Sequence, residues 1–195
     1  MRTTARICMT ALALSTASMG ALSGCSSGSG ASAASKQASE DSRLRVESRA
    51  SLSQLTSTNA AAAALLKDAK GVLVFPKVIK GGLIIGGFHG QGSLVKNGEA
   101  TDLFDSTGGS FGLQAGVQSL SYAMFFMTDE DLKYLNSSDG WEVGVGPNVT
   151  VVDEGLATSL TTTTARKGVY CFFFDQRGLM AGLGIQGSKI TRLNR

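Results

Sequence analysis

The stretch GVLVFPKVIKGGLIIGGFHGQGSLVKNG at residues 71–98 decides the fold of this chain. It consists of short apolar runs separated by glycine, and its first run, Gly71–Phe75, meets Pro76. Proline cannot donate a hydrogen bond to a neighbouring strand, so we expect the first strand to stop there. The Asn97-Gly98 pair predicts a two-residue hairpin, because both residue types tolerate a positive φ angle.

The rest of the chain continues this strand-rich pattern. A second hairpin is predicted at Asp175–Gly178, between apolar runs at 169–174 and 179–186, and further short strands are expected at 141–145 and 148–152. The chain holds 25 glycines. Glycine within a strand lets a sheet bend sharply or another backbone approach closely. A strongly curved, mainly antiparallel sheet or a small barrel is therefore expected.

Helices are predicted before the strands and once among them. Residues 40–70 contain neither glycine nor proline and are rich in good helix formers, which predicts two helices or one helix with a break near Thr56. Thr128 followed by three acidic residues predicts a short capped helix that ends near Leu135. The fold class is therefore α+β, with the N-terminal helices packed on the curved sheet.

The first 25 residues have the features of an export signal. Arg2 and Arg6 precede an apolar run at 7–21 that is too short to span a bilayer. The run ends in Leu-Ser-Gly-Cys25, which resembles the bacterial lipobox, in which the cysteine thiol is acylated. We expect a lipoprotein signal peptide at 1–24 and a lipidated Cys25. The alternative is an ordinary signal peptide cleaved at Ala-Leu-Ser.

The segment after Cys25 predicts a tether. Residues 26–35 contain only serine, glycine and alanine, a composition typical of flexible linkers. We therefore divide the mature chain into an acylated cysteine with its tether at 25–38 and a domain at 39–195. Ser26 in place of aspartate resembles the outer-membrane sorting pattern, so the expected location is the bacterial envelope, anchored by lipid in the outer membrane and facing the periplasm.

Charge is distributed unevenly along the chain. Residues 36–98 hold 9 basic and 4 acidic residues, residues 99–155 hold 1 and 10, and residues 156–195 hold 6 and 1. If the two basic segments converge in space, they form a patch for anionic headgroups. If they do not, they are ordinary solvated surface.

Cys171 is expected in the core. Cys8 lies in the signal segment and Cys25 is expected to be acylated, so no intrachain disulfide is expected. Cys171 is flanked by Val169, Tyr170 and three phenylalanines, surroundings that favour a small buried hydrophobic residue over a reactive thiol.

Two glycine motifs mimic catalytic or nucleotide-binding patterns. Residues 182–187 match G-x-G-x-x-G, but the chain ends at Arg195, which leaves no room for the helix and acidic residue that a dinucleotide site needs. Residues 108–112 match G-x-S-x-G around Ser110, but the single histidine, His89, precedes it, against the order of that hydrolase fold. An enzyme using His89 and Ser110 is the least favoured interpretation, and no catalytic residue is assigned.

Metal and nucleic-acid sites are also not expected. One histidine and one usable cysteine cannot form a zinc site, and Asp129–Asp131 lacks the spacing of a calcium loop. The aromatic residues fall in apolar runs and are not interleaved with a basic stripe. We therefore predict no metal, no cofactor and no nucleic-acid partner.

Most of the chain, from about Leu44 to Ile190, resembles the SYLF domain, also called the Ysc-type actin-binding domain. The most specific stretches are AKGVLVFP at 69–76, KGGLIIGG at 80–87 and GQG at 90–92. Further matching stretches are GGSFGLQAG at 108–116, FMT at 126–128, RGLMAG at 177–182 and GSKI at 187–190.

The resemblance implies a non-enzymatic domain that binds phosphoinositides and other anionic lipids. Eukaryotic members often also bundle actin, a partner that cannot be carried into a bacterial envelope. In those members a basic amphipathic helix near the start of the domain contributes to membrane binding. The corresponding segment here holds Arg43, Arg45 and Arg49 with few large apolar residues, so electrostatic contact is expected in place of insertion.

We therefore expect a membrane-anchored module that binds anionic headgroups. The candidate contacts are cations near glycine-rich turns, where a phosphate can also meet backbone N–H groups. They are Lys77, Lys80, Arg166, Lys167, Arg177 and Lys189. The rival interpretation is a structural or interaction lipoprotein, in which only the acyl anchor meets the membrane and the domain binds an envelope protein or itself.

Overall fold

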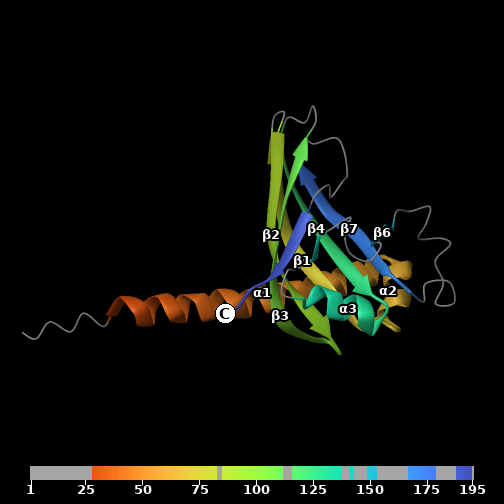
Figure 1. Ribbon diagram of the computed structural model, residues 1–195, viewed down its shortest axis with the longest axis horizontal. Helices are drawn as coiled ribbons and strands as arrows, with labels where there is room; N and C mark the ends of the chain where they lie inside the picture. Colours follow the sequence, from red (N-terminus) through yellow and green to blue (C-terminus); the bar gives the residue numbers. More distant parts are fainter. Residues whose placement is uncertain are drawn as a thin grey trace, which may run out of the picture.

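A computed structural model of the chain describes residues 28–82, 85–111, 116–137, 141–142, 149–152, 167–178 and 188–194. Its described part is one curled sheet with three helices (Figure 1). The strands are β1 (Gly71–Gly82), β2 (Ile85–Lys96), β3 (Glu99–Phe111), β4 (Gly116–Phe126), β5 (Trp141–Glu142), β6 (Val149–Val151), β7 (Val169–Gly178) and β8 (Ser188–Arg192). The α+β prediction is confirmed.

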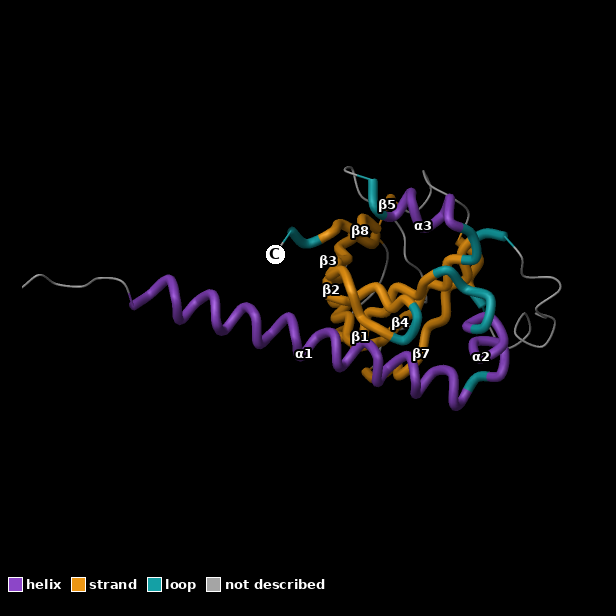
Figure 2. The backbone as a smooth tube through the Cα atoms, turned by 90° about the horizontal axis from the view of Figure 1, so that it is seen from below, coloured by secondary structure: helices purple, strands orange, loops and turns teal. Residues whose placement is uncertain are grey.

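The sheet has the strand order β5-β8-β3-β2-β1-β4-β7-β6. All described strand pairs are antiparallel except β6 with β7, which run parallel. Within the described residues β5 and β6 are its two edges, so the sheet is strongly curled but open (Figure 2). Of the two predicted forms, the structure adopts the curved sheet.

The N-terminal helices divide where a break was expected. Helix α1 (Gly28–Thr58) ends just before Asn59, whose side chain accepts a hydrogen bond from the Ala62 backbone N–H at 3.0 Å and caps helix α2 (Ala60–Leu66). Both helices lie against the convex side of the sheet (Figure 2). The prediction of two helices, packed on the sheet, is confirmed.

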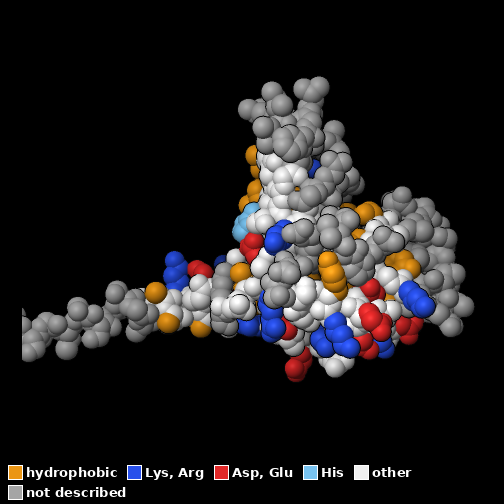
Figure 3. Space-filling view, viewed as in Figure 1, with side chains coloured by type: hydrophobic (Ala, Val, Ile, Leu, Met, Phe, Trp, Pro, Cys, Tyr) orange, Lys and Arg blue, Asp and Glu red, His pale blue; other side chains and the backbone are white. Residues whose placement is uncertain are grey.

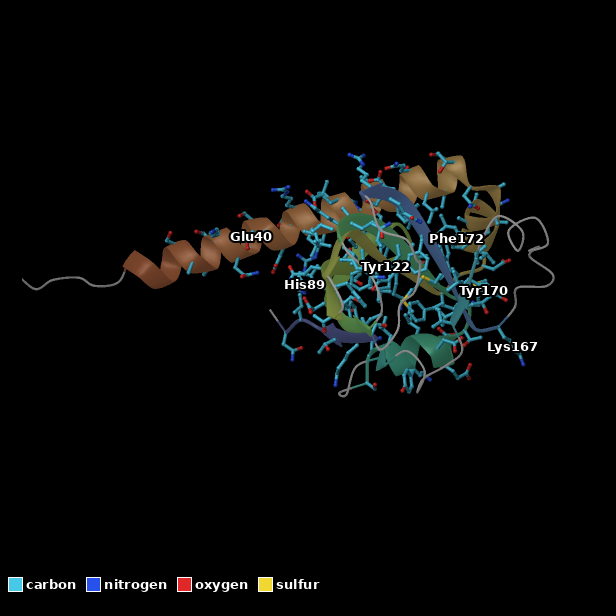
Figure 4. The ribbon with its side chains drawn as sticks, turned by 90° about the horizontal axis from the view of Figure 1, so that it is seen from above. Glu40, His89, Tyr122, Lys167, Tyr170 and Phe172 are labelled. Atoms are coloured by element: carbon cyan, nitrogen blue, oxygen red, sulfur yellow. The ribbon has the colours of Figure 1, made fainter. Side chains whose placement is uncertain are left out.

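Two apolar clusters lie on opposite faces of the sheet. On the outer face, Leu52 of α1 and Leu65 of α2 pack against strand residues that include Val72 and Phe125. On the inner, concave face a second cluster is closed at one end by helix α3 (Asp129–Leu135). Tyr122 lies inside the curl (Figure 4), where its ring stacks on that of Phe75 with centroids 4.6 Å apart. The domain therefore has two separate hydrophobic cores, one on each face of the sheet.

The expectation that the first strand stops at Pro76 is wrong. β1 continues to Gly82 because Pro76 lies in a β-bulge, where the strand has one extra residue relative to both neighbours: Val74 and Lys77 pair with Ser93 and Gln91. A bulge interrupts the regular pattern of hydrogen bonds between strands. A proline in the bulge therefore removes no inter-strand hydrogen bond, although it has no N–H. The Pro76 carbonyl oxygen accepts a hydrogen bond from Ser121 Oγ at 2.8 Å.

The predicted hairpin at Asp175–Gly178 is also wrong. These residues lie within β7 and pair with β4, with one extra β7 residue between the pairs Ser121–Phe174 and Ser119–Arg177. Asp175 has φ 48°, a positive angle that serves a bulge as well as a turn. The strand predicted at 179–186 lies outside the described residues.

The start of α1 differs from the predicted flexible tether. α1 begins at Gly28, so most of the segment 25–38 is helical. Alanines at 31, 33 and 34, and an (i, i+4) pair between Lys36 and Glu40 at 3.9 Å, favour helix. Asp41 is the first buried residue of α1, so the preceding turns extend past the sheet (Figures 1 and 2).

Three other local predictions are confirmed within the described residues. Asn97 and Gly98 have φ angles of 52° and 82° and connect β2 to β3 directly. Thr128 caps α3, its side-chain oxygen accepting from the Asp131 backbone N–H at 3.2 Å. The strands expected at 141–145 and 148–152 are present as β5 and β6 within the described residues.

Replacing Gly92 by alanine should destabilise the domain. A Cβ at Gly92 would lie 2.2 Å from the Val74 carbonyl oxygen, at the bulge, so backbone must move. We expect the free energy of unfolding to fall by about 1–3 kcal/mol, the usual cost of overpacking, measured by urea denaturation. The matched control is Gly109→Ala, whose Cβ meets only the Gly86 carbonyl oxygen at 4.0 Å. Equal stability of the two variants would contradict the role of the bulge.

Cys171 should be inert to alkylation in the folded protein. It is 1% exposed, as expected for a core residue, and burial raises the pKa of its thiol to about 12. Because the thiolate is the nucleophile, the neutral thiol that prevails at pH 8 does not react. Iodoacetamide at pH 8 should leave the Cys171 peptide unmodified in mass spectrometry and modify it fully in guanidinium. Rapid native modification would show that this core opens readily.

Candidate functional site

The outer face of the sheet extends past the helices that cover it. Figure 1 shows the strands projecting beyond α1, toward the end of the sheet remote from α3. Val72 and Val74, on the covered part, are buried. The next outer residues of β1, after the bulge at Pro76, are Lys77 and Ile79, which are exposed. The bulge therefore marks the boundary between covered and uncovered outer face.

Strand register places several exposed side chains around Ile79. Residues directly opposite each other in a sheet point to the same face. Ile79 pairs with His89 on β2 and with Ser119 on β4, and Ser119 pairs with Arg177 on β7. Val117 lies two residues from Ser119, so it shares this face. We call the surface formed by Lys77, Ile79, His89, Val117 and Arg177 the outer distal face.

Two large apolar side chains on the outer distal face are exposed. Ile79 is 50% exposed and Val117 is 68% exposed. Figure 3 shows hydrophobic side chains beside the single histidine, on the part of the sheet that projects away from α1. Exposed apolar groups next to cations suit a surface that is partly apolar and partly anionic.

The cations of the outer distal face come from different segments of the chain. Lys77 lies on the strand that carries Ile79, and Arg177 lies two strands away, about 10 Å across the sheet. The Arg177 guanidinium contacts Asp175 Oδ1 at 3.1 Å, so part of its charge is offset locally. Its side chain is nonetheless 78% exposed.

His89 is paired with a carboxylate. Its Nδ1 lies 3.4 Å from Asp105 Oδ1, and the histidine side chain is 61% exposed. Asp105 lies on the neighbouring strand β3 and is less exposed than His89. The pair with Asp105 places a carboxylate beside His89 at the edge of the outer distal face, so the pair carries no net positive charge.

The remaining candidate residues do not converge on this surface. Lys80 lies on the inner face and is buried. Lys189 is exposed on β8 opposite Thr107, on the outer side but three strands from Ile79. Lys167 precedes β7 at the end near α3, and Figure 4 shows it far from His89. Arg166 and the lipidation candidate Cys25 lie outside the described residues.

Sequence reasoning did not anticipate a small polar pocket beside α1. The pocket has a volume of about 140 Å³ and lies where α1 meets β3 and the C-terminal segment. Arg45 Nε donates to the Thr101 carbonyl oxygen at 3.1 Å, and Arg192 pairs with Asp102. Both arginines therefore already have partners here: the Arg45 bond joins α1 to β3, and the Arg192 pair joins β8 to β3.

Ile79 and Val117 were also missed, because each lies in a short run of mixed apolar, polar and glycine residues, KVIKGG at 77–82 and GVQSL at 116–120, which does not indicate which face of a strand is covered. Their exposure follows from the sheet outgrowing its helices, a property of the assembled fold. No signal within the runs themselves distinguishes them from buried valines and isoleucines.

The described residues offer no catalytic arrangement. Ser110 lies within β3, opposite Gly86, whereas a nucleophile elbow requires a turn from strand to helix. In this part of the chain no group of three or more His, Cys, Asp or Glu residues could hold a metal ion. None of the helices described is both long and apolar enough to cross a bilayer.

Part of the chain matches a known protein family. No curated protein matches the chain. The family model that matches is Ysc84, described as Las17-binding protein actin regulator, and it covers residues 107–195. The covered segment includes Val117 and Arg177, whereas Lys77, Ile79 and His89 precede it. The family is in general one of non-catalytic binding domains. Residues 107–195, from the end of β3 onward, are therefore similar to the Ysc84 family.

Proposed function

We propose that this domain binds membranes that contain anionic lipids, through the outer distal face. The observation that carries the proposal is the exposure of Ile79 and Val117 between Lys77 and Arg177. Apolar side chains that enter the acyl boundary and cations that meet headgroups are the two components of peripheral membrane binding. The SYLF resemblance, which implies lipid binding, supports the same function.

The charge pattern supports attraction to anionic surfaces over neutral ones. Each lysine or arginine near an anionic bilayer contributes about 1 kcal/mol. Lys77 and Arg177 provide two such charges. Asp175 contacts Arg177 and Asp105 lies beside His89, so the net attraction is modest and depends on salt. Binding should therefore be weak unless a second attachment assists it.

That second attachment is the proposed acyl anchor. We propose that Cys25 is lipidated and holds the protein in the bacterial envelope, on the outer membrane and facing the periplasm. The lipobox-like residues 22–25 support this location. An anchored domain meets its membrane at high effective concentration, so weak headgroup contacts suffice. Intact-mass measurement of the protein from its native membrane should show an acylated Cys25, and an unmodified thiol would contradict the anchor.

Charge reversal on the outer distal face should abolish the preference for anionic vesicles. In the full chain carrying Cys25→Ser, we expect the double variant Lys77→Glu/Arg177→Glu to bind phosphatidylglycerol vesicles at least tenfold more weakly in flotation assays. Two lost attractions of about 1 kcal/mol each exceed the 1.4 kcal/mol that a factor of ten requires. Raising the salt concentration should remove the same difference.

The control is the double variant Lys67→Glu/Lys133→Glu, which changes the net charge by the same amount. Lys67 lies at the end of α2 and Lys133 on α3, and both are exposed. This variant should bind like the parent protein. Equal loss in both double variants would show that only net charge matters, and equal binding of the parent to neutral and anionic vesicles would exclude the proposal. Absence of binding to both vesicles would favour the interpretation as an interaction lipoprotein.

A further inference from the structure

Lys80 lies on the inner face of the sheet because of the bulge in β1. Leu73 and Phe75 point inward, and regular alternation from them would place Lys80 outside. The extra residue at Pro76 reverses the alternation, so Val78 and Lys80 point inward. Lys80 is 5% exposed, and among the described residues it has no hydrogen bond or ion pair.

Lys80 belongs to a row of inner residues that crosses the sheet. It pairs with Gln118 on β4 and with Phe88 on β2, and the row continues through Gly108 on β3 to Ser188 on β8. Gln118 and Ser188 are 4% and 3% exposed. The backbone of the sheet curls around its inner face, so this row lies on the concave side (Figure 2). We call Lys80, Gln118 and Ser188 the inner polar row.

Two members of the inner polar row have a buried oxygen without the hydrogen-bond partner that burial normally requires. Gln118 Nε2 donates to Gln176 Oε1 at 3.3 Å, but Gln118 Oε1 and Ser188 Oγ have no partner within the described part of the chain. Buried polar groups are nearly always satisfied, and a buried ammonium group without a counterion is strongly unfavourable. Two such oxygens, in one row with a lysine that is 5% exposed, indicate that a bound molecule supplies the partners.

We infer that the inner polar row binds an oxyanion, a phosphate or a carboxylate, that has neighbouring hydroxyl groups. The oxyanion accepts hydrogen bonds from the Lys80 ammonium group. The hydroxyl groups donate to Gln118 Oε1 and Ser188 Oγ. Gly108, between Phe88 and Ser188, contributes no side chain to the row. Val78 and Leu120 form an apolar layer below the row, so the ligand remains at this level.

This site is separate from the outer distal face. Lys77 and Ile79 point to the outer face of β1, whereas Lys80 points to the inner face of the same strand. The inference therefore goes beyond the proposed membrane contact, and either can fail without the other. The ligand is either a soluble molecule that carries the phosphate or carboxylate, or the headgroup of a lipid. Both sources present the same chemical groups to the inner polar row.

Binding by the full chain carrying Cys25→Ser tests the inference. The soluble probes are glycerol 3-phosphate and glycerate, followed by calorimetry and by the rise in Tm that a ligand of the folded state produces. The lipid probes are phosphatidylglycerol and phosphatidylcholine vesicles. We expect Lys80→Met to weaken binding of the effective probe at least tenfold, and Lys80→Arg, which keeps the charge, to restore most of it.

Lys133→Met is the matched control, because it removes an exposed lysine on α3 and should bind like the parent protein. Binding of the soluble probes identifies a free ligand, and Lys80-dependent binding of vesicles alone identifies a lipid head. If Lys80→Met does not fold, Ser188→Ala and Gln118→Leu carry the test. Failure of the parent to bind any probe, or a Lys80→Met protein with higher Tm and unchanged binding, would overturn the inference.

Discussion

Pro76 lies inside the sheet, on a strand with a neighbour on each side, where its missing N–H would leave a carbonyl oxygen unpaired. The β-bulge resolves this constraint by adding one residue to β1 relative to both β2 and β4. Ser121 Oγ donates a hydrogen bond to the Pro76 carbonyl oxygen, so this side chain takes the place of a backbone N–H as the donor. The remainder of the sheet is arranged around this irregularity.

The neighbouring strand shows how closely the bulge is accommodated. Gly90 and Gly92 of β2 face the bulged backbone, and a Cβ on Gly90 would lie 2.5 Å from Val78 Cγ2. The glycines that suggested a curved sheet thus have a specific second role, which is to let two backbones approach. After the bulge, the alternation of side chains along β1 is reversed, so odd-numbered residues point outward and even-numbered residues point inward. Lys77 and Ile79 become solvent-facing, while Lys80 enters the concave side.

Sequence reasoning succeeded where local chemistry decides structure. Asn97-Gly98 and the Thr128 cap depend on residues only a few positions apart, and both were predicted correctly. Prediction from the sequence failed where the same local signal is compatible with two different structures. Positive φ at Asp175 suits a turn or a bulge, and only the partner strand β4 selects the bulge. Pro76 likewise ends many strands but is tolerated where a register shift is available.

The candidate site was predicted only in part, for a related reason. Lys77 and Lys80 were grouped because both are cations near glycine, but alternation cannot be followed across an unrecognised bulge, and they lie on opposite faces. Arg177 reaches the vicinity of Lys77 through pairing of β7 with β4, a long-range contact that no short motif encodes. Lys167, ten residues earlier in the chain, belongs to the other end of the sheet.

Helix α1 has a mechanical consequence for the whole protein. It runs unbroken for 31 residues, about 46 Å, and joins the sheet at Asp41 without an intervening loop. A flexible leash would let the domain sample every orientation about its attachment point. A stiff arm instead transmits any tilt at its first turn directly to the sheet. Which surface of the protein reaches a neighbouring structure is thus governed by the angle at which this arm is held.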